Sequence, residues 1–317
     1  MVSLLRAVST HECWGRRVSL VTMTPMRNHL VIAVVAVSLL SAGCGRSTSG
    51  APAPSASTGT NPSSASAKDL VPAQIRESGV LRVATAEGYP PMEMYKSGTQ
   101  ELTGVDIDLA TAIGARLGLK TQVTNAAFDG LIPGLQAGRW DLAMSSMSDT
   151  PERRQAVDFV DYFQAGGSIM VRKGNPEGIK TLADLCGKKV VLAKGSSNLA
   201  IGERQNDKCE QKMEILQSED APTGLLTLDS GRTIATIVDS PVGHMFAKET
   251  GKYEVLAEQY DAGPWGIAVD KKNTGLRDAV AKGLQELMDS GAYQKILDEY
   301  GVAGNAVPKV TINTEAP

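Results

Sequence analysis

Residues 142–158 read L-A-M-S-S-M-S-D-T-P-E-R-R-Q-A-V-D, and the rest of the chain is best understood outward from this stretch. Its apolar start, residues 142–144, predicts a short strand. Thr150, Pro151 and Glu152 then predict a helix start, because a capping threonine, a proline at the first helical position and an acid in the first turn occur together. A strand, a hydroxyl-rich loop and a helix N-terminus are therefore expected in succession.

Arg153 lies in the first turn of this predicted helix, five residues after Ser148. The serine hydroxyls of the loop, the free N–H groups of the helix N-terminus and the guanidinium would then face one point. Together they would form a receptor for a carboxylate, because the fork of an arginine binds two oxygens at once. The simpler alternative is an arginine in a surface salt bridge beside a turn, so other parts of the chain must distinguish the two.

The composition narrows the class of protein. The chain has 317 residues, a formal net charge of −3 and four cysteines. A charge this close to zero gives no support for a nucleic-acid partner or for an acidic substrate. The length exceeds what one compact domain usually needs, so two lobes are expected.

Residues 1–43 are predicted to be an export signal. Arg27 supplies a positive charge, and residues 30–40 form an apolar core of eleven residues, which is short for a membrane span. Small residues then precede Cys44. This resembles a bacterial lipoprotein signal, whose cysteine is lipidated and becomes the mature N-terminus. An ordinary secretory signal is the alternative, and both would export the protein.

The segments on either side of this signal lead to two further expectations. Residues 1–25 do not fit its start, which indicates that translation begins at Met23 or Met26. Residues 44–68 consist of the lipidated cysteine and a tether of mainly Gly, Ser, Thr, Ala, Pro and Asn, which cannot form a core and is expected to be disordered. The folded part would then lie on the extracellular face of a Gram-positive membrane, or in the periplasm of a Gram-negative cell.

Two cysteines remain if Cys44 carries a lipid, namely Cys186 and Cys209. In an oxidising compartment they are expected to form one disulfide, with two buried thiols as the alternative. Neither has a close histidine or cysteine neighbour, so no metal site is expected.

Residues 69–167 alternate between strand and helix patterns and form the first part of a predicted first lobe. Strands are expected near residues 80–85, 121–124 and 140–144, with helices near residues 104–117 and 128–138. This order predicts a parallel sheet with helices on its faces, and such sheets bind ligands beyond the C-terminal ends of their strands. The side chains that follow these strand ends are Tyr89, Phe128, Ser146 and Ser148, and we expect them to gather on one edge.

Residues 168–263 are predicted to form a second lobe. Ser196 and Ser197 open a helix after a strand at residues 189–193, which indicates either a second anion cradle or a plain N-cap. Asp239 ends another strand, where it could hold an ammonium group or cap the next helix. Residues 264–317 return to the first lobe and carry two C-terminal helices, and the polar tail after Val302 is expected to fray.

Four motifs in this order resemble family 3 of the solute-binding proteins, which serve polar amino acid ABC importers. They are G-V-D-I-D-L-A at 104–110, S-S-M-S-D-T-P-E-R at 145–153, G-S-S-N at 195–198 and W-G-I-A-V at 265–269. The resemblance covers about residues 78–304. It implies an α/β fold of the periplasmic-binding-protein-like II type, in which each of two lobes has a mostly parallel sheet flanked by helices and two hinge crossings join them.

The resemblance also implies roles for individual residues. Arg153 would bind the α-carboxylate of the ligand, with Ser148 and the amide of Ser197 assisting and Ser196 beside them. Asp239 would bind the α-ammonium.

The remaining ligand contacts follow from the same resemblance. The Ser146 hydroxyl and the Met147 carbonyl would assist Asp239, and Tyr89 and Phe128 would enclose the ligand side chain. Many members of the family have an aspartate or asparagine where this chain has Ala86, which weakens the case for a cationic ligand, although Glu87 could substitute.

The expected function is therefore capture of a polar amino acid by a monomeric, lipid-anchored receptor and its delivery to an ABC permease, without a cofactor or catalysis. A dehydratase-type enzyme on the same fold is one alternative. The mature chain would contain one histidine, His244, which disfavours a catalytic triad, whereas a carboxylate pair such as Glu87 and Asp239 stays conceivable. A ligand-sensing module is the other alternative.

Overall fold

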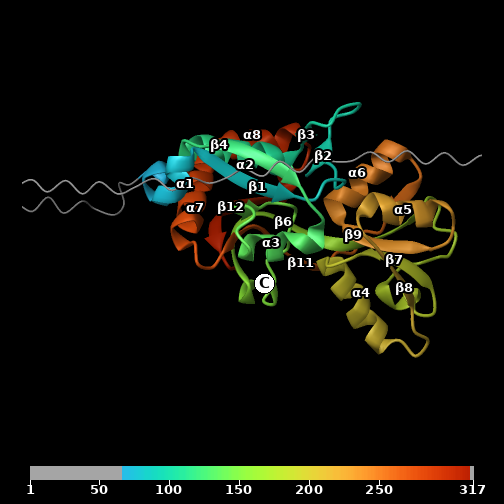
Figure 1. The fold of residues 1–317 in the computed structure, drawn as a ribbon. Helices are drawn as coiled ribbons and strands as arrows, with labels where there is room; N and C mark the ends of the chain where they lie inside the picture. Colours follow the sequence, from blue (N-terminus) through green and yellow to red (C-terminus); the bar gives the residue numbers. More distant parts are fainter. Residues whose placement is uncertain (1–65, 315–317) are drawn as a thin grey trace, which may run out of the picture. The chain divides into compact units, whose positions relative to one another are not determined.

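The computed structural model describes residues 66–314, which fold around one large mixed sheet (Figure 1). Its main path runs β4-β1-β5-β11-β6-β9-β7-β8, and β10 and β12 both pair with β6. The strands are β1 (Val80–Thr85), β4 (Lys120–Asn125), β5 (Leu142–Ala143), β6 (Val157–Arg172), β7 (Lys189–Ala193), β8 (Glu214–Ser218), β9 (Ala235–Asp239), β10 (Tyr253–Val255), β11 (Tyr260–Asp270) and β12 (Ala306–Ile312); β2 (Met94–Tyr95) and β3 (Leu102–Thr103) pair separately.

The sheet contains two parallel groups of strands that are joined by long antiparallel ones. We call β4, β1 and β5 with their helices lobe 1, and β7, β8 and β9 with theirs lobe 2. β6 pairs with β11 through its first half and with β9 through its second, so one strand belongs to both lobes. This arrangement confirms the predicted α/β class. The predicted lobe boundaries, near residues 168 and 263, fall inside β6 and β11.

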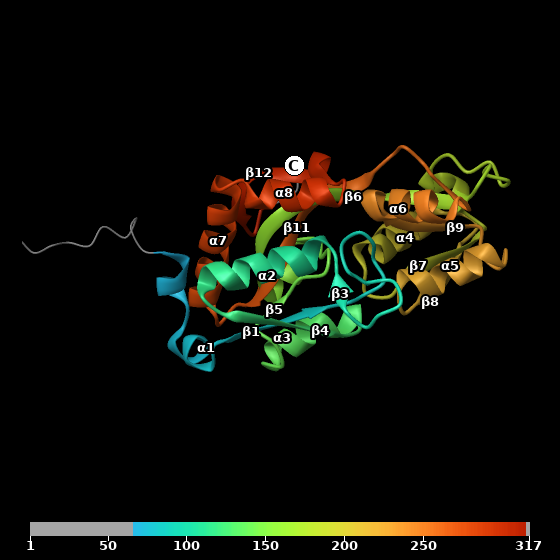
Figure 2. The same cartoon turned by 90° about the horizontal axis from the view of Figure 1, so that it is seen from above.

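Helices cover both lobes. They are α1 (Ala73–Ser78), α2 (Val105–Leu117), α3 (Leu131–Gln136), α4 (Ser197–Lys208), α5 (Ala221–Asp229), α6 (Ser240–Thr250), α7 (Thr274–Asp289) and α8 (Ala292–Glu299). Figure 2 shows α4, α5 and α6 beside β7, β8 and β9, with α2 and α7 on the other lobe. The described chain begins at Ser66, and Ala67 is already buried against the lobe 1 core.

The G-V-D-I-D-L-A motif forms the start of α2. Apolar residues at helical spacing along α2 are buried, with Ile113 and Leu117 in the main core. Gly104 precedes the helix with φ of 128°, and a Cβ there would lie 2.1 Å from the Met92 carbonyl oxygen. Only glycine therefore allows the loop after β1 to pack this closely against the helix start.

Two local predictions are wrong. The expected helix after Thr150 is a single 3-10 turn, Arg153–Gln155, because the chain enters β6 at Val157. The Thr150 cap itself is present, since the Arg153 N–H donates to its hydroxyl at 3.2 Å.

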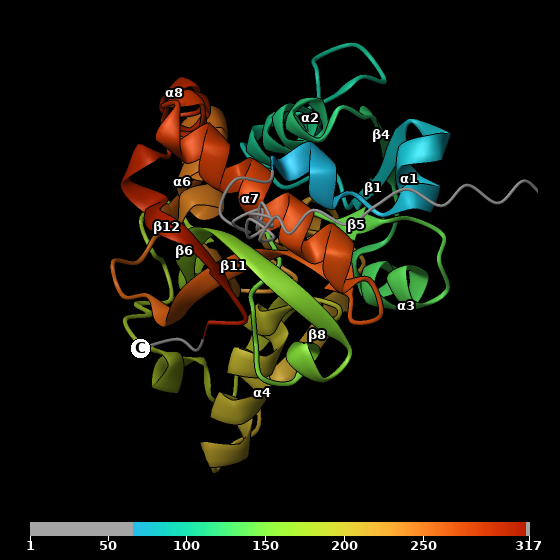
Figure 3. The same cartoon turned by 90° about the vertical axis from the view of Figure 1, so that its left-hand side faces the viewer.

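The tail is the second error: it forms β12 instead of fraying, and Figure 3 shows it beside β6. The Asn313 side chain accepts from the Phe159 N–H at 2.8 Å, which ties the end of this strand to lobe 1. Backbone pairing with a distant strand outweighs the polar composition of the segment.

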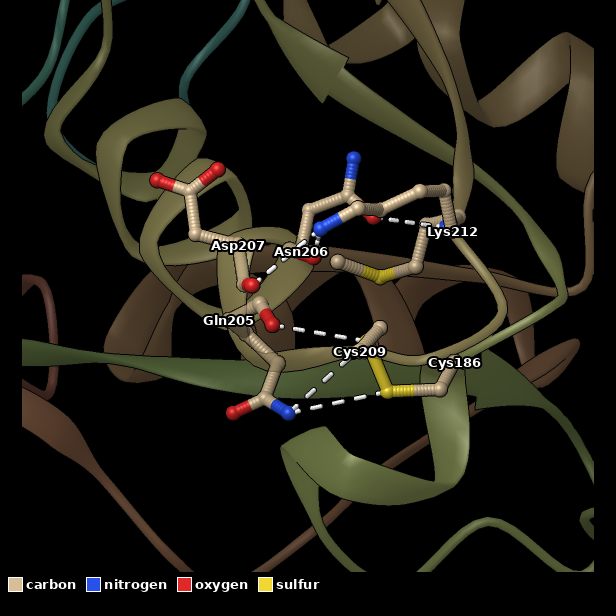
Figure 4. The surroundings of a disulfide bond; sticks show 7 residues. Cys186, Gln205, Asn206, Asp207, Cys209 and Lys212 are labelled. Carbon is tan, nitrogen blue, oxygen red and sulfur yellow. Dashed lines mark hydrogen bonds between the residues drawn. A yellow bond between two sulfur atoms is a disulfide. The ribbon is translucent and has the colours of Figure 1, made fainter.

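Cys186 and Cys209 form a disulfide in lobe 2, as predicted (Figure 4). It joins the turn before β7 to the C-terminal end of α4, and Cys209 is 6% exposed. The bond therefore braces the helix whose N-terminus lies at the candidate site described below.

Replacing both cysteines by serine should lower the free energy of unfolding by about 3 kcal/mol, because a loop of this length loses its covalent closure. Urea denaturation of the oxidised wild type and of the double variant measures the difference. Wild-type protein treated with a reductant is the matched control and should lose a similar amount. Equal stability of all three forms would contradict this role.

Within residues 66–314, no helix has both the length and the apolar character needed to cross a membrane. The predicted signal, the lipidation site Cys44 and most of the tether lie outside the described residues.

Candidate functional site

A cavity lies where the two lobes meet, at the C-terminal ends of their parallel strands. Lobe 1 contributes the loops after β1 and β5, and lobe 2 contributes the loops after β7, β8 and β9. Such strand ends are the expected position of a ligand site in this class of sheet. The polar and aromatic lining includes Glu87, Tyr89, Glu93, Phe128, Ser146, Arg153, Ser196, Ser197, Asn198, Glu219, Asp220 and Asp239.

Arg153 is fixed at this cavity by contacts from both lobes. Its guanidinium donates to the Ser148 carbonyl at 2.9 Å and to the Gly195 carbonyl at 3.0 Å. It also lies 5.4 Å from the centre of the Phe128 ring, a cation–π distance. Burial lowers the pKa of Arg153 to about 10, although Asp239 and Glu152 oppose this shift. The guanidinium is therefore a charged group, largely withdrawn from water, that forms no ion pair with a carboxylate of residues 66–314.

Asp239 lies on the opposite lobe and is 6% exposed. The Tyr89 hydroxyl donates to its carboxylate at 2.6 Å and accepts from its backbone N–H at 3.2 Å. Burial raises the pKa of Asp239 to about 6, while hydrogen bonds from Tyr89 and Asn198 and the charge of Arg153 act in the other direction. The side chain does not cap α6, so of the two alternatives weighed from the sequence the capping role is wrong.

Polar contacts hold the lobes together around the cavity. The hydroxyls of Ser148 and Ser197 are 3.0 Å apart, and Lys194 forms an ion pair with Asp129 at 2.8 Å. The contact from Tyr89 to Asp239 and that from Arg153 to Gly195 also join the lobes. The groups expected to bind a ligand thus satisfy one another here.

Two buried acidic residues, Glu93 and Asp106, hold the loop after β5 in place. Ser146 has a positive φ of 48°, and its N–H donates to Asp106 at 2.8 Å, while its hydroxyl donates to Glu93 at 3.2 Å. Tyr162 donates to the other Asp106 oxygen at 2.7 Å. Burial, and then the Asp106 charge, raise the pKa of Glu93 well above its usual range, and burial raises that of Asp106 to about 6. Glu93 and Asp106 therefore position the hydroxyl and the backbone N–H of Ser146.

Eight of the ten predicted ligand residues line this cavity, and the other two, Met147 and Ser148, do not. Met147 is 1% exposed and packs in the core, and its carbonyl accepts from Gly266 at 2.9 Å. Ser148 and Met147 line a neighbouring groove, which shares Arg153 with the cavity.

The serines at the start of α4 have different roles. The Ser196 hydroxyl accepts from the Leu199 N–H at 3.0 Å, which makes it the helix N-cap that was weighed as the simpler alternative. Ser197 lies one residue further and lines the cavity with its hydroxyl toward Ser148. An anion cradle at this helix would therefore depend on Ser197 and the helix N-terminus rather than on Ser196.

The lining residues that were missed from the sequence include Glu93, Asn198, Glu219 and Asp220. Asp220 precedes Ala221 and Pro222, a pattern typical of an N-cap, and its carboxylate accepts from the Thr223 N–H at 2.7 Å. That signal, with its position directly after β8, could have placed Asp220 at the edge of the sheet. Nothing local marks Glu93 as buried.

No group of three or more His, Cys, Asp or Glu side chains arranged to hold a metal ion occurs in the described part of the chain.

Comparison with known proteins gives a consistent result. The family described as bacterial extracellular solute-binding proteins, family 3, matches residues 81–303. The arginine-binding protein ArgT of Corynebacterium glutamicum is 30% identical over 255 residues, which cover 78% of this chain and 82% of that protein. The ABC transporter glutamine-binding protein GlnH of Bacillus subtilis is 28% identical, over 85% of this chain and 94% of its own.

Solved structures show the same fold. An ancestral arginine-binding protein bound to arginine aligns with a TM-score of 0.66 and 35% identity, covering 70% of this chain and 98% of its own. An ancestral amino acid-binding protein described as a precursor of cyclohexadienyl dehydratase aligns with a TM-score of 0.65 and 32% identity, covering 72% and 97%.

Proposed function

The chain belongs to family 3 of the bacterial extracellular solute-binding proteins, and from that premise we propose that it captures a polar amino acid between Arg153 and Asp239. Its relatives include amino acid-binding proteins of ABC transporters, so it is a solute-binding protein of such a system. The observation that carries the proposed site is the placement of these two opposite charges on one cavity, each from a different lobe.

The charges match the two ends of an amino acid. The guanidinium would take the α-carboxylate in a forked, charge-assisted pair, and the Asp239 carboxylate would take the α-ammonium. Both groups are largely withdrawn from water, which strengthens such pairs. The ligand would replace the contacts that Tyr89 and Gly195 now make with them.

Lobe closure would couple ligand capture to delivery. A ligand that contacts both lobes stabilises the closed state by the difference between its affinities for the closed and open states. The closed, liganded form would be the one that the permease accepts. We also propose that the receptor is a monomer anchored through a lipid on Cys44; loss of labelling by a fatty-acid analogue in Cys44→Ala would test the anchor.

We further propose that the protein binds its ligand without catalysing a reaction. Its named relatives are binding proteins, although one structural neighbour is described as the precursor of a dehydratase. An acid–base pair would need Glu87 and Asp239 beside a substrate. Incubating the purified protein with cyclohexadienyl acids and following product by absorbance tests this alternative, and turnover would contradict the proposal.

A thermal-shift screen of the twenty amino acids tests the proposed function. A ligand that binds only the folded state raises the melting temperature by mass action, by an amount that grows with its concentration. We expect at least one polar amino acid to give a saturable rise and sugars to give none. Absence of any shift, followed by absence of heat in calorimetry, would contradict the assignment.

Affinity should fall in acid, because the ligand ammonium needs an ionised Asp239. The pKa of this carboxyl is raised to about 6, so its charge is present above that value and is lost as the pH falls through it. Affinity should therefore drop about tenfold between about pH 7.5 and about pH 5, with proton release on binding near the midpoint. Calorimetry in two buffers measures both quantities.

The Tyr89→Phe variant tests the pH dependence of affinity in a second way. The Tyr89 hydroxyl lowers the pKa of Asp239, so its removal should move the midpoint of the pH profile to higher pH. A midpoint that moves to lower pH, or a profile without any dependence on pH, would contradict the role given to Asp239.

A further inference from the structure

The cavity has more carboxyl groups than the α-groups of an amino acid can match. Among the described residues that line it, Arg153 has the only cationic side chain, whereas five side chains are acidic. The five are Glu87, Glu93, Glu219, Asp220 and Asp239. In the proposed function Arg153 and Asp239 balance the carboxylate and ammonium of the ligand. That arrangement gives the other four acidic side chains no role in binding the ligand.

Two of these four are already satisfied. Glu93 accepts from the hydroxyls of Ser145 and Ser146, at 3.0 and 3.2 Å, and burial raises its pKa, which disfavours its charged form. Glu219 is exposed, so water solvates its charge, and it lies near Lys194, whose pKa is raised by Asp129 first and then by Glu219. Glu87 and Asp220 remain, and within residues 66–314 neither forms an ion pair of 4.0 Å or less.

Glu87 and Asp220 reach the cavity from opposite lobes. Glu87 follows β1 in lobe 1, and Asp220 caps α5 in lobe 2. Their loops are in close contact, since a Cβ on Gly88 would lie 3.0 Å from Pro222 Cγ. Burial first, and then the charge of Asp220, raise the pKa of Glu87. Closure of the lobes therefore brings two like charges together unless a cation lies between them.

The Asn198 side chain lies beside Gly167, where a Cβ would be 2.2 Å from its oxygen. It lines the cavity and is 3% exposed, yet its side-chain oxygen has no partner in the described part of the chain. A buried acceptor left unpaired is costly and calls for a donor. Within the described residues, the Glu87 and Asp220 carboxylates thus lack a cationic partner and the Asn198 oxygen lacks a donor, and all three groups are acceptors.

We propose, given the proposed function, that the ligand is an amino acid with a long cationic side chain whose distal charge lies between Glu87 and Asp220. Phe128 and Leu225 line the same cavity and would cover the methylenes of such a side chain. The distal cation would neutralise both carboxylates and so stabilise lobe closure. Ala86 in place of an acid does not exclude such a ligand, because the two carboxylates replace its charge.

L-arginine and L-citrulline test this proposal, because they share size and α-groups and differ in one distal charge. We expect the wild-type protein to bind arginine about a hundredfold more tightly than citrulline in calorimetry. Equal affinities, tighter binding of citrulline or binding of neither would overturn the proposal. This comparison needs no variant and so does not depend on the folding of one.

The Glu87→Gln/Asp220→Asn double variant assigns the effect to these residues. Its preference for arginine should fall below about tenfold while citrulline affinity stays within a few-fold of wild type. Asp207→Asn/Glu210→Gln removes the same number of charges from exposed positions and should keep the full preference. An unchanged preference in the Glu87/Asp220 variant would overturn the assignment.

The proposed function and the cationic class of ligand can be contradicted separately. If a neutral amino acid binds best and Arg153→Ala removes that binding, the proposed function stands and the cationic class is wrong. If no amino acid binds, the proposed function fails as well.

Discussion

Replacing Arg153 by alanine should abolish measurable amino acid binding. The guanidinium lies at the junction of both lobes, donating to the Ser148 and Gly195 carbonyls, and is the only cation among the described cavity residues. Without it the ligand carboxylate would enter a largely desolvated site with no counter-charge. Removing one partner of a buried charge pair costs about 3–5 kcal/mol, or roughly two to three and a half orders of magnitude in affinity. Isothermal calorimetry measures this loss.

Two comparisons make the result specific. Arg153→Lys keeps the charge but loses the fork, so it should recover part of the affinity and remain weaker than wild type. Arg139→Ala removes an exposed arginine outside the cavity and should bind normally. Circular dichroism confirms that each variant is folded. Wild-type affinity in a folded Arg153→Ala protein would mean that the ligand carboxylate binds elsewhere.

Replacing Asp239 by asparagine should weaken binding by about 2–5 kcal/mol, or roughly thirtyfold to several thousandfold, because the ligand ammonium loses its buried counter-charge. Asparagine keeps the size of the side chain and an oxygen for the Tyr89 hydroxyl, so the loss reports charge rather than shape. The pH dependence of affinity between about pH 5 and about pH 7.5 should also largely disappear.

As the pH rises through about 6, the contribution of Asp239 to the stability of the folded protein should fall, whereas the affinity for the ligand should rise. The folded pKa of Asp239 is raised, so its contribution to stability is present below the unfolded pKa and is lost as the pH rises through about 6. At neutral pH the uncharged Asp239→Asn variant should therefore melt no earlier than wild type. Asp207→Asn, at an exposed position, is the matched control and should change neither quantity. Loss of affinity with a matching loss of melting temperature would indicate misfolding instead.

Much of the fold follows from local sequence. The alternation of apolar stretches with helical periodicity predicted the parallel strands of lobe 1, and the residues after β1, β4 and β5 were expected at one edge. These features depend on spacing within about a turn or a strand, so single segments reveal them. The disulfide followed from the number of cysteines and the expected compartment.

The two wrong predictions concern segments that pair with strands far away in the sequence. The helix expected after Thr150 has a correct cap, but it ends after one turn because the chain then pairs as β6. The tail was expected to fray because of its polar composition, yet it finds a partner strand in β6. In both places a pairing with a distant segment overrides a local preference.

By itself, the sequence determined the α/β pattern, the strand ends that carry the polar residues, and the identities of Arg153 and Asp239 as opposite charges. Only the tertiary structure decided what those residues touch: Tyr89 reaches Asp239 across 150 positions, and the loop that carries Glu87 packs against the start of α5, which Asp220 caps. The physical reason is that burial and closure, not residue type, set which buried charges are matched, and both arise from contacts between segments far apart in the chain.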